Sequence, residues 1–143
     1  MGQAYTRLIR LRVNDTFILF VDDEPLVVKV VRSILERSGI CHVAASGAAE
    51  AEALFDEHGD KITLLVTNVV MPQVNGRELC ERLRAKRPSL PVIFVSGYVD
   101  DPELIETLGD SAQGQLLEKP FRPSDLLEAI QVAMDDVQER IGS

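Results

Sequence analysis

Apolar and polar positions follow two alternating patterns along the chain, and these patterns predict repeated strand–helix units. Short continuous apolar runs occur at Phe17–Val21, Leu64–Val66 and Val92–Val95. Runs of this kind are typical of strands that are covered on both faces. Two weaker strands are expected at Cys41–Ala45, which consists mainly of small residues, and at Gln115–Glu118, which follows two glycines. The pattern therefore predicts a sheet built from these segments.

Helical spacing of apolar residues fills the segments between the strands. The first helix follows Asp22-Asp23-Glu24-Pro25, where an acidic cap and a proline in the first turn favour a helix start, and Gly39 closes it. Its buried stripe is expected to consist of Val27, Val30, Val31, Ile34 and Leu35. Further helices are expected at residues 48–58, after the Asn75-Gly76 turn pair to about Arg87, at residues 102–108, and from Ser124 onward with Ser124 as the cap.

This order, a strand followed by a helix in each repeat, indicates an α/β fold. Crossovers between parallel strands are right-handed, so helices cover both faces of a parallel sheet. We expect a flavodoxin-like, doubly wound, five-stranded parallel sheet in the order 2-1-3-4-5, formed by residues 16–143. Residues 1–15 are interpreted as an N-terminal extension or linker, in which Ile9, Leu11 and Val13 could form a short extra strand.

Composition and charge limit the function classes. The chain has 143 residues, 45% of them hydrophobic and 27% charged, which fits one globular domain with a core. Its formal net charge is −8, with an isoelectric point near 4.7. An acidic surface disfavours nucleic acid and anionic membranes as partners. It is compatible with cation binding or with a basic protein partner.

The sequence contains neither a membrane segment nor a cysteine motif. No run approaches the roughly 18 apolar residues of a membrane span. Arg7, Arg10 and Arg12 interrupt the apolar residues near the N-terminus, which argues against a signal peptide. We therefore expect a cytoplasmic protein without membrane insertion. Cys41 and Cys80 have no CxxC spacing, so both are expected to be reduced and buried.

Polar residues follow four of the predicted strands. Asp22 and Asp23 come after the first strand, Asn68 ends the third, Ser96 ends the fourth and Lys119 follows the fifth. Because the carboxyl ends of parallel strands share one edge of a sheet, these side chains are expected around one crevice. Each also has an ordinary explanation: the aspartates could cap the next helix, the serine could be a turn residue, the lysine could be solvated, and the asparagine could be a solvated strand end.

The types of side chain at this edge suggest a cation and a phosphoryl group. Two adjacent carboxylates, Asp22 and Asp23, repel each other unless a cation or a lysine lies nearby. Mg²⁺ suits oxygen ligands in a half-open site that retains waters. Lys119 and the hydroxyl of Ser96 would suit phosphoryl oxygens on the opposite side.

Four motifs together resemble the receiver domain of two-component response regulators, over residues 17–141. They are Val21–Glu24, Leu64–Gly76, Val95–Tyr98 and Glu118–Phe121, in the same order and at compatible spacing. The form with MPxxxG and SGY is similar to receivers attached to hybrid histidine kinases. The resemblance implies a signalling module rather than an enzyme, with a histidine kinase or its phosphotransfer domain as a partner and an output domain or protein as another.

The resemblance also implies roles at the metal site. Asp23 would bind Mg²⁺ directly and Asp22 mostly through water, with the backbone carbonyl of Val70 and residue 68 as further ligands. Because Asn68 lacks the charge of an aspartate, although its carbonyl can still ligate, Mg²⁺ binding is expected to be weak.

At the phosphoryl site, Ser96 and Lys119 would bind the phosphoryl oxygens, and the Lys119–Pro120 bond is expected to be cis. Two positions depart from the family. Asn68 stands where the phosphoaccepting aspartate is expected, so the chain should not accept a phosphoryl group there. Leu116 stands at the usual position of an aromatic switch residue, although Tyr98 lies close to Ser96 in sequence.

Three hypotheses follow. The chain is a receiver whose phosphoacceptor is replaced by an introduced or natural mutation, or it is a pseudo-receiver that binds its partner constitutively. An enzyme on a similar fold is disfavoured because the sequence has no P-loop.

The family implies a partner face on the fourth helix, fifth strand and fifth helix, and a monomer or weak homodimer. With few residues after the last helix, we expect a stand-alone regulator or an excised domain.

Overall fold

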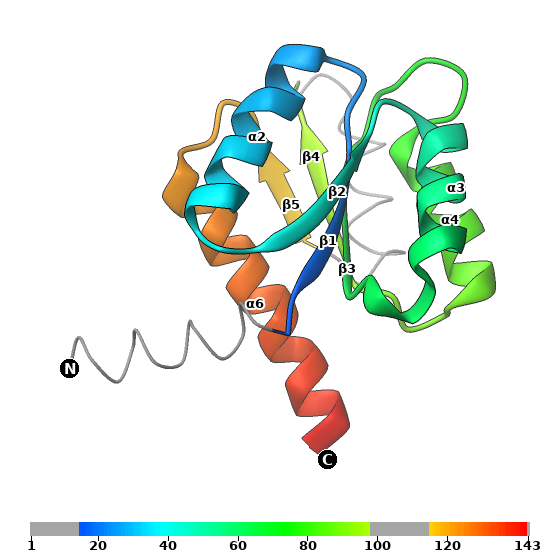
Figure 1. The fold of residues 1–143 in the computed structure, drawn as a ribbon, viewed down its shortest axis with the longest axis vertical. Helices are drawn as coiled ribbons and strands as arrows, with labels where there is room; N and C mark the ends of the chain where they lie inside the picture. Colours follow the sequence, from blue (N-terminus) through cyan, green and yellow to red (C-terminus); the bar gives the residue numbers. More distant parts are fainter. Residues whose placement is uncertain (1–14, 98–114, 143) are drawn as a thin grey trace.

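The computed structural model describes residues 15–97 and 115–142, and it contains a parallel sheet with helices on both faces (Figure 1). The strands are β1 (Phe17–Val21), β2 (Cys41–Ala45), β3 (Leu64–Asn68), β4 (Val92–Ser96) and β5 (Gln115–Glu118). Every neighbouring pair is parallel, and the order is β2-β1-β3-β4-β5. The predicted fold class and strand order are confirmed.

The helices lie on the two faces of this sheet. They are α2 (Pro25–Arg37), α3 (Ala48–His58), α4 (Gly76–Lys86) and α6 (Pro123–Gly142), with a short 3-10 turn, η1 (Gly59–Lys61), after α3. In Figure 1, α2 and α6 lie on one side of the strands and α3 and α4 on the other. The predicted helix at residues 102–108 and the predicted strand at residues 9–13 lie outside the described residues.

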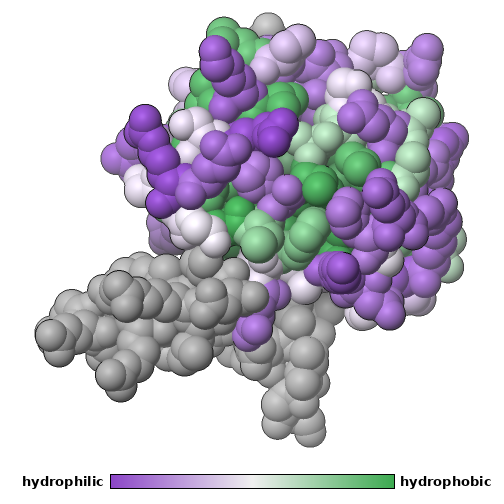
Figure 2. All heavy atoms as spheres, viewed as in Figure 1, coloured by the Kyte–Doolittle hydropathy of each residue, from purple (hydrophilic) through white to green (hydrophobic). Residues whose placement is uncertain are grey.

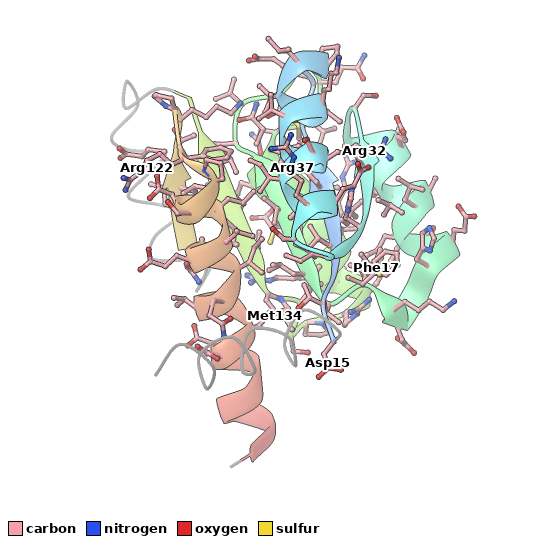
Figure 3. All side chains as sticks on the ribbon, turned by 60° about the vertical axis from the view of Figure 1, so that its left-hand side comes forward. Asp15, Phe17, Arg32, Arg37, Arg122 and Met134 are labelled. Carbon is pink, nitrogen blue, oxygen red and sulfur yellow. The ribbon has the colours of Figure 1, made fainter. Side chains whose placement is uncertain are left out.

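The core has two parts because successive residues of a strand point to opposite faces of the sheet. In β1, Leu19 and Val21 pack with the buried residues of α3 and α4, whereas Ile18 and Phe20 pack with those of α2 and α6. Met134 of α6, labelled in Figure 3, belongs to this second part and is almost fully buried. This burial on both faces explains why β1, β3 and β4 are continuous apolar runs.

The face of the molecule that Figure 2 shows is largely polar. Figure 2 shows hydrophilic side chains over most of the visible face, with apolar side chains gathered near its middle. Arg32 and Arg37, labelled in Figure 3, are exposed on α2. Among the described residues, no helix is long and apolar enough to cross a membrane.

Helix α2 starts and ends close to the predicted positions. Pro25 is its first residue, and Gly39 follows its end with a φ of 71°, a conformation that glycine adopts at little cost. Glu24 is the N-cap residue, but its side chain makes no capping hydrogen bond. The backbone amide of Glu24 donates instead to Oδ1 of Asp22, at 2.9 Å, so the first aspartate holds this turn.

Three details of the sequence prediction are wrong. Val30 is 50% exposed rather than buried, because Val31 occupies the centre of the buried stripe and consecutive helical residues point about 100° apart. Ser124 is not the cap of α6: the helix begins one residue earlier, at Pro123, and Asp125 accepts a hydrogen bond from the backbone amide of Arg122. Cys41 is exposed, because it begins β2 at the edge of the sheet.

Candidate functional site

The carboxyl edge of the sheet brings together segments that are distant in the sequence. Asn68 lies beside Val95 in the register of β3 and β4, and Ser96 lies beside Glu118 in that of β4 and β5. The loop after β1 contributes two aspartates, which contact side chains from the ends of β3 and β5. The predicted convergence of polar residues at this edge therefore exists in the structure.

Asp22 is the buried centre of these contacts. Its side chain has no exposed surface, and its Oδ2 forms an ion pair with Nζ of Lys119 at 2.9 Å. Its Oδ1 accepts the hydrogen bond from the backbone amide of Glu24. A buried carboxylate is costly unless it is paired and hydrogen-bonded, and both oxygens of Asp22 have a partner.

Asn68 is also buried, with 6% of its surface exposed. Its Nδ2 donates to the backbone oxygen of Val70 at 2.9 Å and lies 3.4 Å from Oδ1 of Asp23. Both neighbours are acceptors, so the amino group of the carboxamide, and not its oxygen, must face them. The side chain thus connects the end of β3 to the loop after β1.

The loop after β3 is shaped by close backbone packing around Asn68. A Cβ atom on Gly76 would lie 2.2 Å from the backbone oxygen of Asn68, so only glycine fits there. The amide of Gly76 donates to the oxygen of Val69, and the side chain of Asn75 caps α4 by accepting from the amide of Glu78 at 2.8 Å. The Asn75-Gly76 pair, predicted as a turn, is therefore the N-cap and first residue of α4.

Thr67 is a residue of this site that sequence reasoning missed. It is fully buried, and its hydroxyl donates to the backbone oxygen of Asn68 at 3.1 Å. A threonine inside an otherwise apolar strand is a weak signal, because threonine is also common in strands for its shape.

At the other side of the site, Ser96 is buried and Lys119 is mostly buried. The backbone amide of Lys119 donates to the backbone oxygen of Ser96 at 2.8 Å, which fixes the end of β5 against β4. The Lys119–Pro120 peptide bond is cis, as predicted. Leu116, at the position of the expected aromatic switch, is 38% exposed.

The arrangement of oxygens does not fit a divalent cation as it stands. The predicted ligands are Asp22, Asp23, Asn68 and the carbonyl of Val70. Asp22 is paired with Lys119, and the amino group of Asn68 lies against the oxygens of Asp23 and Val70. Over residues 15–97 and 115–142, no three histidine, cysteine, aspartate or glutamate side chains converge as metal ligands.

Comparison with other proteins agrees with the fold and the motifs. The family model "Response regulator receiver domain" matches residues 18–131. The chain is 34% identical over 119 residues to the sensor kinase CckA of Brucella abortus, which covers 82% of the chain and 12% of CckA. It is 38% identical over 122 residues to the response regulator Rre1 of Synechocystis, covering 79% of the chain and 48% of Rre1.

A solved structure agrees as well. The structure of a CheY-like response regulator receiver domain protein from Methanospirillum hungatei has a TM-score of 0.76 and 29% identity, and the match covers 87% of this chain and 98% of that one. The chain spans less than half the length of CckA and of Rre1, and nearly all of this receiver structure. The chain therefore belongs to the response regulator receiver domain family of two-component signal transduction.

Proposed function

We propose that this chain is a receiver module that does not accept a phosphoryl group at position 68. The observation that carries the proposal is the environment of Asn68: it is buried at the end of β3, within the group formed with Asp23 and the loop after β3. In this proposal Asp22 and Asp23 are the acidic pocket, and Ser96 and Lys119 are the groups that would face phosphoryl oxygens.

The chemistry of asparagine explains why position 68 would not accept a phosphoryl group. Forming an acyl phosphate requires a carboxylate oxygen as the nucleophile. The amide nitrogen of Asn68 is not nucleophilic, because its lone pair is delocalised into the carbonyl, and its hydrogens point at the oxygens of Val70 and Asp23. The other residues of a phosphoryl-transfer site position the reactants and stabilise the charge that develops on the phosphoryl group. Without a nucleophile at position 68, they have no reaction to promote.

The signalling role then rests on protein contacts. A histidine kinase, its phosphotransfer domain or an output protein is the partner class that the family implies. The similarity to a sensor kinase and to a response regulator supports both of these settings for the module. As a pseudo-receiver, the second candidate, the chain would bind such a partner in the same way at all times, and the internal bonding of the acidic pocket supports that candidate.

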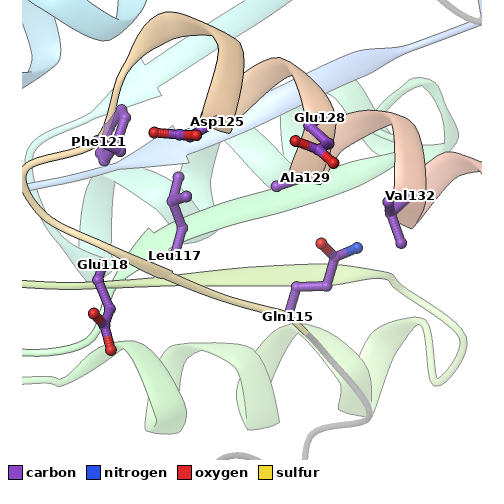
Figure 4. Close-up of a pocket in the computed structure, with 8 residues that line it drawn as sticks. All are labelled: Gln115, Leu117, Glu118, Phe121, Asp125, Glu128, Ala129 and Val132. Carbon is purple, nitrogen blue, oxygen red and sulfur yellow. The ribbon is translucent and has the colours of Figure 1, made fainter.

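The partner face includes β5 and α6. Figure 4 shows a groove between these elements, in which Leu117, Phe121 and Val132 lie among acidic side chains. The acidic residues around it are Glu118, Asp125 and Glu128. The third predicted part of this face, the segment at residues 102–108, lies outside the described residues. Hydrogen exchange with and without the cognate kinase tests the face, and protection confined to α3 and α4 would refute it.

The test of the proposed function is intact mass after incubation with acetyl phosphate and Mg²⁺. The chain as it stands should gain no phosphoryl group. The Asn68→Asp variant, which is nearly isosteric, should gain one that is labile to base. Equal gain by both forms would show that position 68 is not the acceptor. If neither form reacts, the pseudo-receiver candidate is favoured over the receiver with a replaced acceptor.

A further inference from the structure

Each carboxylate of the acidic pocket lies against a side-chain nitrogen of this chain. Lys119 holds Asp22, and the amino group of Asn68 lies against Asp23. Two adjacent carboxylates repel each other unless a positive charge lies nearby. Here the Lys119 ammonium supplies that charge within the protein, and the neutral amide of Asn68 adds a hydrogen-bond donor beside Asp23.

The side-chain amide of Asn68 contacts a main-chain oxygen as well as the carboxylate of Asp23. Its 2.9 Å hydrogen bond to the backbone oxygen of Val70 draws the loop after β3 toward the loop after β1, where Asp23 lies. The resemblance to receivers implies that a divalent cation would bind the carboxylate of Asp23 and the main-chain oxygen of Val70. In this structure the amino group of Asn68 lies between these two oxygens.

We propose that the Asn68 carboxamide replaces the divalent cation as the link between Asp23 and the backbone of Val70, so that this receiver closes its acidic pocket without metal. The amide and a cation then compete for the same oxygens. This inference rests on the proposed function, since both place residue 68 at the centre of the site, but it concerns cation binding rather than phosphorylation.

The two possible roles of Asn68, competitor of the metal or ligand of the metal, predict opposite effects of truncating its side chain on Mg²⁺ affinity. If the Asn68 oxygen were a metal ligand, truncating the side chain would weaken Mg²⁺ binding. If its amino group competes with the metal, truncation frees two oxygens, and water can fill the space. Asn68→Ala should then bind Mg²⁺ roughly 3- to 30-fold more tightly than the unchanged chain, in line with the loss of one or two competing hydrogen bonds.

Calorimetric titration with MgCl₂ of the unchanged chain, Asn68→Ala and Asn68→Asp tests this. The expected order of affinity is aspartate first, alanine second and asparagine last, because the aspartate adds a charged ligand and the alanine only removes a competitor. Ser89→Asp is the matched control for added charge: it places a carboxylate on an exposed residue before β4, at the opposite edge of the sheet. It should leave Mg²⁺ affinity within about twofold.

A measurement on the unchanged chain does not depend on how the variants fold. The side-chain amide protons of Asn68 should show slow exchange with solvent in NMR spectra, and their resonances should not move on adding a few millimolar MgCl₂. An alanine variant that binds Mg²⁺ more weakly than the asparagine form would overturn the proposal, as would amide protons that exchange as fast as those of exposed asparagines. Either result leaves the mass test at position 68 unaffected, so the two proposals fail separately.

Discussion

At the scale of single residues, the site depends on a buried charge that has one charged partner in the described structure. Asp22 is fully buried, and Lys119 reaches it from the position directly after β5, with 17% of its own side chain exposed. Removing one member of such a pair leaves the other charge without compensation, which costs more than the pair contributes when it is intact.

Lys119→Met should therefore lower the free energy of unfolding by about 2–4 kcal/mol, measured by urea denaturation. The matched control is Lys86→Met, because Lys86 pairs with Asp56 on the exposed surface of α3 and α4, where the loss should stay below about 1 kcal/mol. Adding Asp22→Asn to Lys119→Met should restore part of the stability. Equal losses for both lysines would contradict the assignment of a buried pair.

The two cysteines differ in reactivity for a structural reason. Burial raises the pKa of the Cys80 thiol, an effect that Arg84 opposes and Glu81 reinforces, so less of it is thiolate at a given pH. Cys41 is exposed. Native protein treated with iodoacetamide at pH 8 should be alkylated once, at Cys41, with Cys80 reacting as the pH rises further or after unfolding. Peptide mapping that finds Cys80 modified first would contradict this.

At the scale of elements, the strands were predictable and the helix details were less so. Continuous apolar runs identified β1, β3 and β4 because both faces of the sheet are covered. The predicted buried face of α2 was wrong at Val30, because apolar spacing alone does not say which of several valines faces the sheet. The predicted start of α6 was wrong at Ser124. The helix begins at Pro123, and the side chain of Asp125 accepts a hydrogen bond from the amide of Arg122 just before it.

The convergence of polar residues at the carboxyl edge of the sheet was predictable, but the hydrogen bonds between them were not. The ends of strands supplied Asp22, Asp23, Asn68, Ser96 and Lys119 from sequence order alone. Which oxygen faces which nitrogen depends on the path of the loop after β3, and a sequence pattern does not specify that path. For this reason the ligation expected of the Asn68 carbonyl was plausible, whereas the structure turns the amino group inward.

Helix α4 approaches β3 so closely that one glycine decides the packing. Gly76→Ala should lower the midpoint of thermal unfolding by several degrees, equivalent to about 2–3 kcal/mol, because its methyl group would overlap the backbone oxygen of Asn68. Gly47→Ala, at the N-cap of α3, is the control: nothing lies within 4 Å of its new methyl group. A loss at Gly76 no larger than at Gly47 would contradict the close packing.

At the scale of the whole molecule, the chain already carries a net charge of −8, and a carboxylate at position 68 would add a further charge beside two aspartates. Asn68→Asp should lower the urea midpoint in metal-free buffer through repulsion with Asp23, and MgCl₂ should restore it by mass action. The unchanged chain should show almost no such dependence on Mg²⁺. Ser89→Asp separates the local effect from general charge, and an equal loss in that variant would refute the local repulsion.

The ion pair between Asp22 and Lys119 also has a consequence for how the chain reaches its final form. Its two members lie 97 positions apart. During synthesis Asp22 therefore leaves the ribosome long before its counter-ion, and contacts of such separation form late in folding. The edge strand β5, which Lys119 directly follows, would then join a sheet beside which the carboxylate of Asp22 is still hydrated. Chains cut short before Gln115 should fail to bury that carboxylate.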